Sequence, residues 1–211
     1  MNKTHDDTIK VTQASEVHIP GMAKCHIESF PGRFMTEMGY HWLCALYRFF
    51  IKHRGSICRV AVDADGKVIG LAVGGNPHIR EEFLSSALYR YPHLLFWKFL
   101  SNRFVRRILL QELARKLRRK NTAALSKNTK IPSVGIRSGN LLSICVLPEC
   151  EGTGVGRRLI ESFQLACKTE GYNRLTLSVL KQNSRAVAFY TKNGWRQSGI
   201  SGDSIRFVLD L

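Results

Sequence analysis

The chain has 211 residues, of which 44% are hydrophobic, and its 32 Lys and Arg residues against 16 Asp and Glu give a formal net charge of +16. This hydrophobic content is ordinary for a globular protein and excludes wholesale disorder, while the length suits a single domain, residues 1–211, that carries an insertion. No run of about 18 uncharged apolar residues exists, which argues against a membrane-spanning helix, and the polar N-terminus lacks the apolar core of a signal peptide. We therefore expect a cytoplasmic protein.

The cysteines do not form the close pairs that a zinc site needs, so we expect no metal and reduced, buried thiols. Cys145 lies within an apolar strand pattern, and we interpret it as a core thiol rather than as a nucleophile that carries an acyl group. The six cysteines are Cys25, Cys44, Cys58, Cys145, Cys150 and Cys167.

The first third of the chain predicts one strand, two helices and a hairpin. Residues 9–12 alternate between apolar and polar side chains, which is typical of a strand. Residues 15–30 predict a helix, with Ser15 as its N-cap and apolar residues at helical spacing. After a break at Pro31 and Gly32, apolar residues recur at helical spacing over residues 35–53. Residues 58–75 then read as two strands joined by the turn Asp-Ala-Asp-Gly.

A strongly basic segment, which we interpret as a helical insertion, follows at about residues 80–138. Residues 83–130 contain twelve basic residues and a single acid, Glu112, so this segment carries +11 of the total charge of +16. Tyr91-Pro92 breaks the pattern, residues 94–100 and 104–117 predict one or two helices, and residues 121–139 predict a loop.

Three interpretations of the insertion stay open. Its basic face, from Arg103 to Lys120, suits peripheral attachment to an anionic membrane through apolar residues such as Phe96, Trp97 and Phe99. The same cations suit a phosphate-rich partner, such as ribosomal RNA or a nucleotide-linked acceptor. The third interpretation is a packed helix whose basic face is solvated.

The most informative segment combines a strand, a glycine-rich turn and a helix. Residues 140–146 form a short apolar run, Gly152, Gly154 and Gly156 follow, and residues 157–170 have helical periodicity. Glycines let a phosphate approach the backbone, and the start of a helix offers unpaired N–H groups. The spacing excludes a dinucleotide fingerprint, which needs glycine where Arg157 stands, and a P-loop, which needs Gly-Lys-Ser/Thr at residues 157–159.

This segment resembles the GNAT acyltransferases, whose Gln/Arg-x-x-Gly-x-Gly/Ala signature matches Glu-Gly-Thr-Gly-Val-Gly at residues 151–156. The resemblance extends to a second strand at residues 175–180 and to a helix at residues 183–195 that is similar to the family's Asn-x-x-Ala-x-x-Phe-Tyr-x-x-x-Gly-Phe. With the hairpin, these segments cover about two thirds of the chain. The resemblance implies an α/β (α+β) fold, in which a mixed, mostly antiparallel, twisted sheet of six to seven strands is flanked by helices.

The resemblance also implies acetyl-coenzyme A as the co-substrate. The backbone of Val146 would bind the thioester carbonyl, Asn183 the pantetheine or the helix entry, and the phenol of Tyr190 would protonate the departing sulfur. The pyrophosphate would lie on Glu151, Gly152, Thr153, Gly154, Val155, Gly156, Arg157 and Arg158. Glu151 departs from the family's Gln or Arg, and we expect Arg157 and Arg158 to compensate its charge.

The general base is harder to identify, because residues 138–146 contain no carboxylate. Glu28, Glu37 and His78 are the candidates from the sequence, and a chain of water molecules is the alternative.

The resemblance predicts an N-acetyltransferase that moves an acetyl group directly to a primary amine. An amino sugar, an amino acid and a protein N-terminus are the acceptors to consider. Two alternatives remain: transfer of a longer acyl chain from an acyl-carrier protein, and a non-catalytic module that binds membranes or nucleic acids. The intact glycine turn and Tyr190 argue against the module, since a binding protein needs neither.

Overall fold

The computed structural model describes residues 9–103, 105–107, 110–111 and 135–211. Its strands form one sheet in the order β1-β2-β3-β4-β5-β7-β6, in which only the β4–β5 pair is parallel. The mixed, mostly antiparallel sheet predicted from the sequence is thereby confirmed. The strands are β1 (Lys10–Gln13), β2 (Ser56–Val62), β3 (Val68–Gly75), β4 (Ser138–Val146), β5 (Arg174–Leu180), β6 (Arg196–Ser201) and β7 (Ser204–Asp210).

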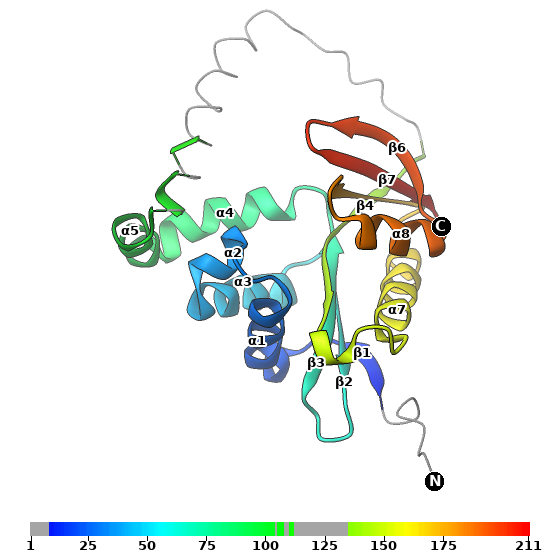
Figure 1. Ribbon diagram of the computed structural model, residues 1–211, viewed down its shortest axis with the longest axis horizontal. Helices are drawn as coiled ribbons and strands as arrows, with labels where there is room; N and C mark the ends of the chain where they lie inside the picture. Colours follow the sequence, from blue (N-terminus) through cyan, green and yellow to red (C-terminus); the bar gives the residue numbers. More distant parts are fainter. Residues whose placement is uncertain (1–8, 104, 108–109, 112–134) are drawn as a thin grey trace, which may run out of the picture.

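Helices cover both faces of the sheet. In Figure 1, the helices up to α5 lie on one side of the first four strands, and α7 lies on the other side. Two short 3-10 turns, η1 (Glu16–His18) and η2 (Pro148–Cys150), precede α1 and α7. The helices are α1 (Ile19–Ser29), α2 (Phe34–Met38), α3 (Tyr40–Lys52), α4 (Ile79–Arg90), α5 (Pro92–Ser101), α7 (Val155–Thr169) and α8 (Ser184–Lys192).

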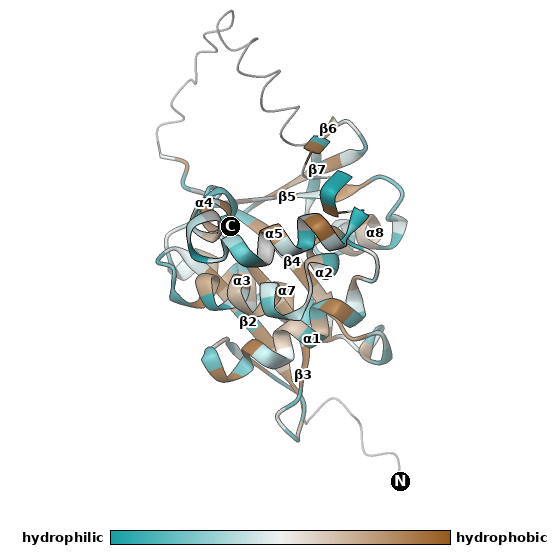
Figure 2. Ribbon diagram, turned by 90° about the vertical axis from the view of Figure 1, so that its left-hand side faces the viewer, coloured by the Kyte–Doolittle hydropathy of each residue, from teal (hydrophilic) through white to brown (hydrophobic). Residues whose placement is uncertain are grey.

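The core lies between the first four strands and these helices. Every residue of β3 is buried, as expected for a central strand covered on both faces, and Figure 2 shows β2 and β3 largely in the hydrophobic colour. On α7 the buried side chains recur at helical spacing, at Val155, Leu159, Phe163 and Cys167.

The helix predicted over residues 35–53 is wrong as a single element. Gly39 adopts φ +91°, a left-handed conformation that ends α2 at Met38 and lets α3 begin at Tyr40. The helix predicted over residues 15–30 likewise begins with the turn η1 before α1.

The described part of the insertion is anchored on the helices of the same face. Phe83 of α4 is buried and packs edge-on against Trp42 of α3, with ring centroids 5.2 Å apart. At the end of α5, the Asn102 Nδ2 donates to Glu37 Oε2 over 2.9 Å. The break at Tyr91-Pro92 is confirmed, whereas most of the helix predicted over residues 104–117 and of the loop over 121–139 lies outside the described residues.

A bulge in β4 determines how the sheet opens. Ser143 pairs with Val73 and Leu141 with Gly74, so Leu142 is an extra residue on β4. Such a residue bends its strand and increases the local twist. Gly74 makes room for it, because a Cβ there would lie 2.0 Å from the carbonyl oxygen of Asn140.

Candidate active site

The opening between β4 and β5 is the centre of the candidate site. The two strands pair over only three positions, Ser138 to Asn140 with Arg174 to Thr176, although β4 continues to Val146. At about 3.3 Å per residue, roughly 20 Å of β4 beyond Asn140 runs without a β5 partner in this register. The bulge at Leu142 lies where the separation begins, so it explains why the strands diverge.

The backbone of Val146 faces this opening. Leu147 N–H donates to the Ile69 carbonyl over 2.8 Å, which makes the Gly70–Val146 pair a non-hydrogen-bonded one. The N–H and C=O of Val146 therefore point away from β3. Ser29 Oγ, at the end of α1, donates to the Val146 carbonyl over 3.1 Å.

The glycine turn lies between η2 and α7. Gly152 and Gly154 have φ +80° and +87°, in the left-handed region, and a Cβ at either would meet nothing within 4 Å. Thr153 Oγ1 ties the turn together by donating to the Cys150 carbonyl over 2.6 Å. The first helical bond of α7 runs from Arg158 N–H to the Gly154 carbonyl, so the N–H groups of residues 155–157 find no acceptor within the helix. Such a helix start attracts anions.

Glu151 has an ion-pair partner that the sequence did not indicate. Arg185 of α8 forms the ion pair with Glu151. Arg157 instead pairs with Glu161 one turn along α7, at 2.8 Å, and Arg158 Nη2 donates to the Ile9 carbonyl over 2.6 Å. Compensation of the Glu151 charge by Arg157 and Arg158 therefore stays a prediction, while the direct ion pair comes from α8.

Helix α8 positions Asn183 and Tyr190. Asn183 Oδ1 accepts a hydrogen bond from the Ala186 N–H over 3.1 Å, so it caps the helix entry. Tyr190 is 8% exposed and packs among the rings of Trp195 and Phe207. Burial raises the pKa of Tyr190 to about 12, so its phenol keeps its proton at neutral pH.

Helices α7 and α8 approach each other beside the opening. A Cβ at Gly156 would lie 3.5 Å from the Phe189 ring, and 3.7 Å from the Val146 side chain. The glycine turn, Val146 and the helix that carries Tyr190 are therefore gathered in one place, as the sequence motifs predict.

The three base candidates lie in different places. Glu28 is exposed at the end of α1, next to Ser29, whose hydroxyl touches Val146. Glu37 accepts a hydrogen bond from Asn102 and so belongs to the anchor of the insertion. His78 is exposed at the start of α4, just beyond the Gly75–Asn140 pair, roughly 20 Å along the sheet from Val146. That separation is too long for direct proton transfer at Val146, which argues against His78 as the base.

A buried polar cluster between α1 and α3 was not predicted from the sequence. His26 is 7% exposed, and its Nδ1 lies 2.7 Å from the Tyr47 hydroxyl. Burial lowers the pKa of His26 to about 4, so the ring is uncharged at neutral pH while it shares this hydrogen bond with Tyr47. No sequence pattern connects α1 with α3 at these two positions.

Cys25 and Cys145 lie next to this cluster, with their Sγ atoms 4.0 Å apart. The contact with Cys25 and the burial of the thiol raise the pKa of Cys145 well above its ordinary value. Cys145 is therefore a protonated thiol of the core, which does not suit a nucleophile.

The described residues hold no group of three or more His, Cys, Asp or Glu side chains that could bind a metal ion. Among the described helices, none combines the length and the apolar character needed to cross a membrane.

Comparison with known proteins agrees with the fold. The structure resembles the PaiA N-acetyltransferase of Thermoplasma acidophilum, solved in complex with coenzyme A, with a TM-score of 0.60 and 13% identity over 97% of this chain and 99% of that chain. It also resembles the ribosomal-protein-S18-alanine N-acetyltransferase of Escherichia coli, with a TM-score of 0.54 and 12% identity over 96% and 93% of the two chains.

Among curated proteins, the chain is 43% identical over 61 residues to a 5-NmdU N-acetyltransferase of Pseudomonas phage PaMx11. That match covers 29% of this chain and 41% of the phage protein, so it spans less than half of the relative. The model of the acetyltransferase (GNAT) family matches residues 19–195, which is most of the chain and includes the opening, the glycine turn and α8. The chain therefore belongs to the acetyltransferase (GNAT) family.

Proposed function

We propose that this chain transfers an acetyl group from acetyl-coenzyme A directly to a primary amine. The observation that carries the proposal is the opening between β4 and β5, which leads along β4 to the glycine turn at the head of α7. An extended ligand with amide groups at one end and a diphosphate at the other matches this order of features.

The residues at the opening suit the groups of the coenzyme. The space above Gly152 and Gly154 is open, and the N–H groups at the start of α7 would hold the diphosphate. The edge of β4 near Val146 would hold the pantetheine amides. The carboxylate of Glu151 is neutralised by Arg185, so it does not repel the diphosphate at full strength.

In the proposed reaction the thioester supplies the acetyl group, the amine nitrogen forms the new bond to the acetyl carbon, and the carbon–sulfur bond breaks. The Val146 N–H stabilises the negative charge that develops on the carbonyl oxygen. Tyr190, which burial keeps protonated, gives its proton to the departing sulfur. The proton lost by the amine goes to Glu28 or to water, since Glu28 precedes Ser29, whose hydroxyl donates to the Val146 carbonyl.

For the acceptor, we propose an amine carried on a nucleotide or nucleic acid. The net charge of +16 favours a phosphate-bearing partner, and the phage relative is named for its action on 5-NmdU. A panel that contains an amine-bearing oligonucleotide, an amino sugar, an amino acid and a peptide N-terminus, followed by thiol release from acetyl-coenzyme A, tests the acceptor class.

Tyr190→Phe tests the proton donor, with Tyr89→Phe as the matched control, because Tyr89 is 88% exposed on α4. We expect kcat to fall roughly 10- to 100-fold for the first variant and to stay unchanged for the second, while calorimetry shows unaltered coenzyme affinity. Equal kcat for wild type and Tyr190→Phe would remove the proposed role, and no binding of acetyl-coenzyme A at millimolar concentration would end the enzyme proposal.

As a second candidate function, we propose that the protein is cytoplasmic and binds peripherally to membranes. Exposed residues of α5 favour this proposal. Phe96 and Trp97 are 64% and 70% exposed, next to Lys98 and close to Arg103. Exposed aromatic and basic side chains together suit an anionic lipid surface. We expect the wild type to float with anionic liposomes and the variant with both aromatic residues changed to serine to stay unbound. Unaltered flotation of that variant would contradict this candidate.

A further inference from the structure

One face of the C-terminal half of the sheet is polar and lies away from α8. Along β5 and β7, Leu175, Leu177 and Phe207 are buried, and Phe207 contacts Tyr190 of α8 at 5.8 Å between ring centroids. Residues that alternate with them, such as Thr176 and Arg206, must point to the opposite face.

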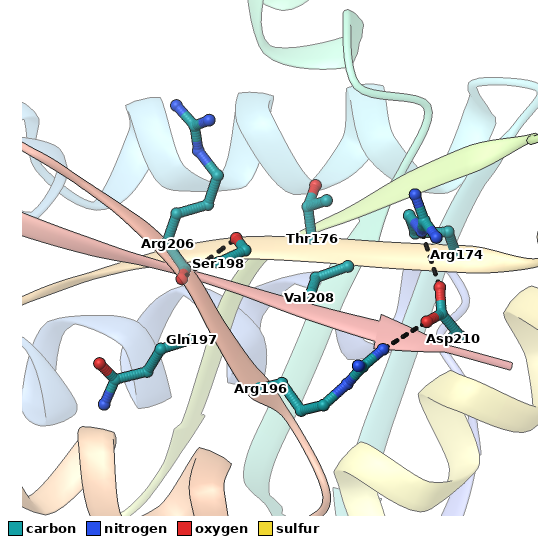
Figure 3. Close-up of a pocket in the computed structure, with 8 residues that line it drawn as sticks. All are labelled: Arg174, Thr176, Arg196, Gln197, Ser198, Arg206, Val208 and Asp210. Carbon is teal, nitrogen blue, oxygen red and sulfur yellow. Dashed lines mark hydrogen bonds and ion pairs between the residues drawn. The ribbon is translucent and has the colours of Figure 1, made fainter. Parts of the chain in front are cut away.

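This polar face contains a hollow of about 530 Å³, which we call the arginine hollow. Figure 3 shows its side chains, with Arg174 and Arg206 rising on the same side of the strands. Most of the residues that line it have polar or charged side chains. The lining residues are Arg174, Thr176, Arg196, Gln197, Ser198, Arg206, Val208 and Asp210.

Asp210 arranges two of the arginines. Its Oδ1 accepts from Arg174 Nε over 2.7 Å and its Oδ2 accepts from Arg196 Nη2 over 2.6 Å, and these bonds lower the pKa of Asp210. Both guanidinium groups keep further N–H donors, because each has five. Asp210 therefore holds the guanidinium groups of Arg174 and Arg196 in place and leaves them N–H donors for binding an anion.

Arg206 adds an uncompensated charge. Within the part of the chain that the structure describes, its side chain has no ion pair, and three arginines against one aspartate leave the hollow with a net charge of +2. Arg206 pairs with Ser178, four residues along β5 from Arg174, which corresponds to about 13 Å between the two arginine backbones. The spacing and the volume exceed what a single phosphate group fills.

We propose that the arginine hollow binds the phosphate backbone of a nucleic acid strand. Arginine guanidinium groups match phosphate oxygens in pairs, and Arg206 together with the remaining N–H groups of Arg174 and Arg196 supplies the donors. An inserted lipid chain would instead need a cluster of apolar side chains, whereas Val208 is the one described lining residue with an apolar side chain.

A polymer fits the position of the hollow better than a mononucleotide does. Thr176, which lines the hollow, pairs with Asn140 of β4. Asn140 lies roughly 20 Å along β4 from Val146. A ligand that occupies the hollow while presenting an amine near Val146 must therefore be several nucleotides long. This last step rests on the proposed acetyl transfer, whereas binding of the strand to the hollow does not.

Fluorescence anisotropy with a labelled 20-nucleotide DNA strand at several salt concentrations tests the proposal. The variants are Arg206→Gln, Arg206→Lys and Arg54→Gln, the last being the control, since Arg54 is an exposed arginine in the turn before β2. We expect Arg206→Gln to weaken binding about tenfold at low salt and to reduce the slope of log Kd against log salt by roughly 0.7 to 0.9. Arg206→Lys should keep the wild-type slope, because it keeps the charge, and Arg54→Gln should match the wild type.

Competition experiments distinguish the sources of phosphate. The unlabelled strand should displace the probe, whereas inorganic phosphate, thymidine monophosphate and anionic lipid vesicles at equal phosphate concentration should not. Equal slopes for Arg206→Gln and Arg54→Gln would overturn the proposal. It would also be overturned if vesicles displaced the probe as well as the strand does from the variant in which Phe96 and Trp97 are changed to serine. Calorimetry with acetyl-coenzyme A on the wild type measures coenzyme binding separately. The proposed acetyl transfer and the proposed binding of a nucleic acid strand can therefore fail independently.

Discussion

The buried His26 makes the stability of this protein depend on pH in a calculable way. Its pKa is about 4 in the folded state against an ordinary 6.5, because burial disfavours the charged ring. As the pH falls below 6.5, the unfolded chain takes up a proton that the folded chain refuses until about pH 4. The stabilisation is therefore complete above pH 6.5, is lost progressively between 6.5 and 4, and changes no further below 4.

The loss can be estimated and measured. A pH of 5 lies 1.5 units below the pKa of 6.5 that the histidine has in the unfolded chain. The free energy of unfolding is therefore about 2 kcal/mol lower at pH 5 than at pH 7 or above. We would measure the free energy of unfolding in urea at pH 7 and pH 5 for the wild type and for His26→Gln, whose amide can either donate to or accept from the Tyr47 hydroxyl. The difference between the two proteins should shrink by about 2 kcal/mol at pH 5.

His41→Gln is the control, because His41 is exposed on α3. Its difference from the wild type should be small and similar at both pH values. A gap between the wild type and His26→Gln that does not change with pH would refute the reasoning, and an NMR titration of His26 with a midpoint near 6.5 would refute it directly.

Three further substitutions have defined outcomes. Asn183→Ala removes the cap of α8 and should cost about 1 kcal/mol in urea unfolding, a loss that Asn183→Ser should largely avoid. Gly74→Ala drives a Cβ into the β4 backbone and should cost about 3 kcal/mol or more in the same measurement, whereas Gly66→Ala, in an open turn at φ +78°, should cost about 1 kcal/mol. Glu151→Gln should raise coenzyme affinity a few-fold in calorimetry and change stability by less than about 0.5 kcal/mol, because its pair with Arg185 is exposed; a drop in affinity would show that the carboxylate assists binding.

Sequence patterns predicted the segments with strong periodicity. The helix expected at residues 157–170 is α7 at Val155–Thr169, and the strand expected at residues 175–180 is β5 at Arg174–Leu180. The hairpin of β2 and β3 also followed from its turn residues. Strand β6 gave no comparable signal, since all six of its residues are exposed and no apolar alternation marks it.

The candidate site was predictable only where its residues lie close together in sequence. The glycine turn and the pair Asn183 and Tyr190 follow from short motifs, because a helix fixes the relative positions of residues on it. The ion pair of Glu151 with Arg185 and the contact of His26 with Tyr47 join different elements, so they depend on packing that local patterns do not encode. The bulge at Leu142, which opens the sheet, leaves no composition signal either.

The early separation of β4 from β5 changes how many strand edges this protein has. A continuous open sheet has two edges, but one that divides after three pairs has four, and the inner two are the ends of β4 and β5. Exposed strand edges invite other chains to add a strand. Here the outer edge β1 is only four residues long, and β6 is kinked by a register shift, while the close approach of Gly156 and Phe189 shields one side of the inner edges. The fold thus keeps an unpaired row of backbone groups for a slender ligand while making it a poor template for aggregation.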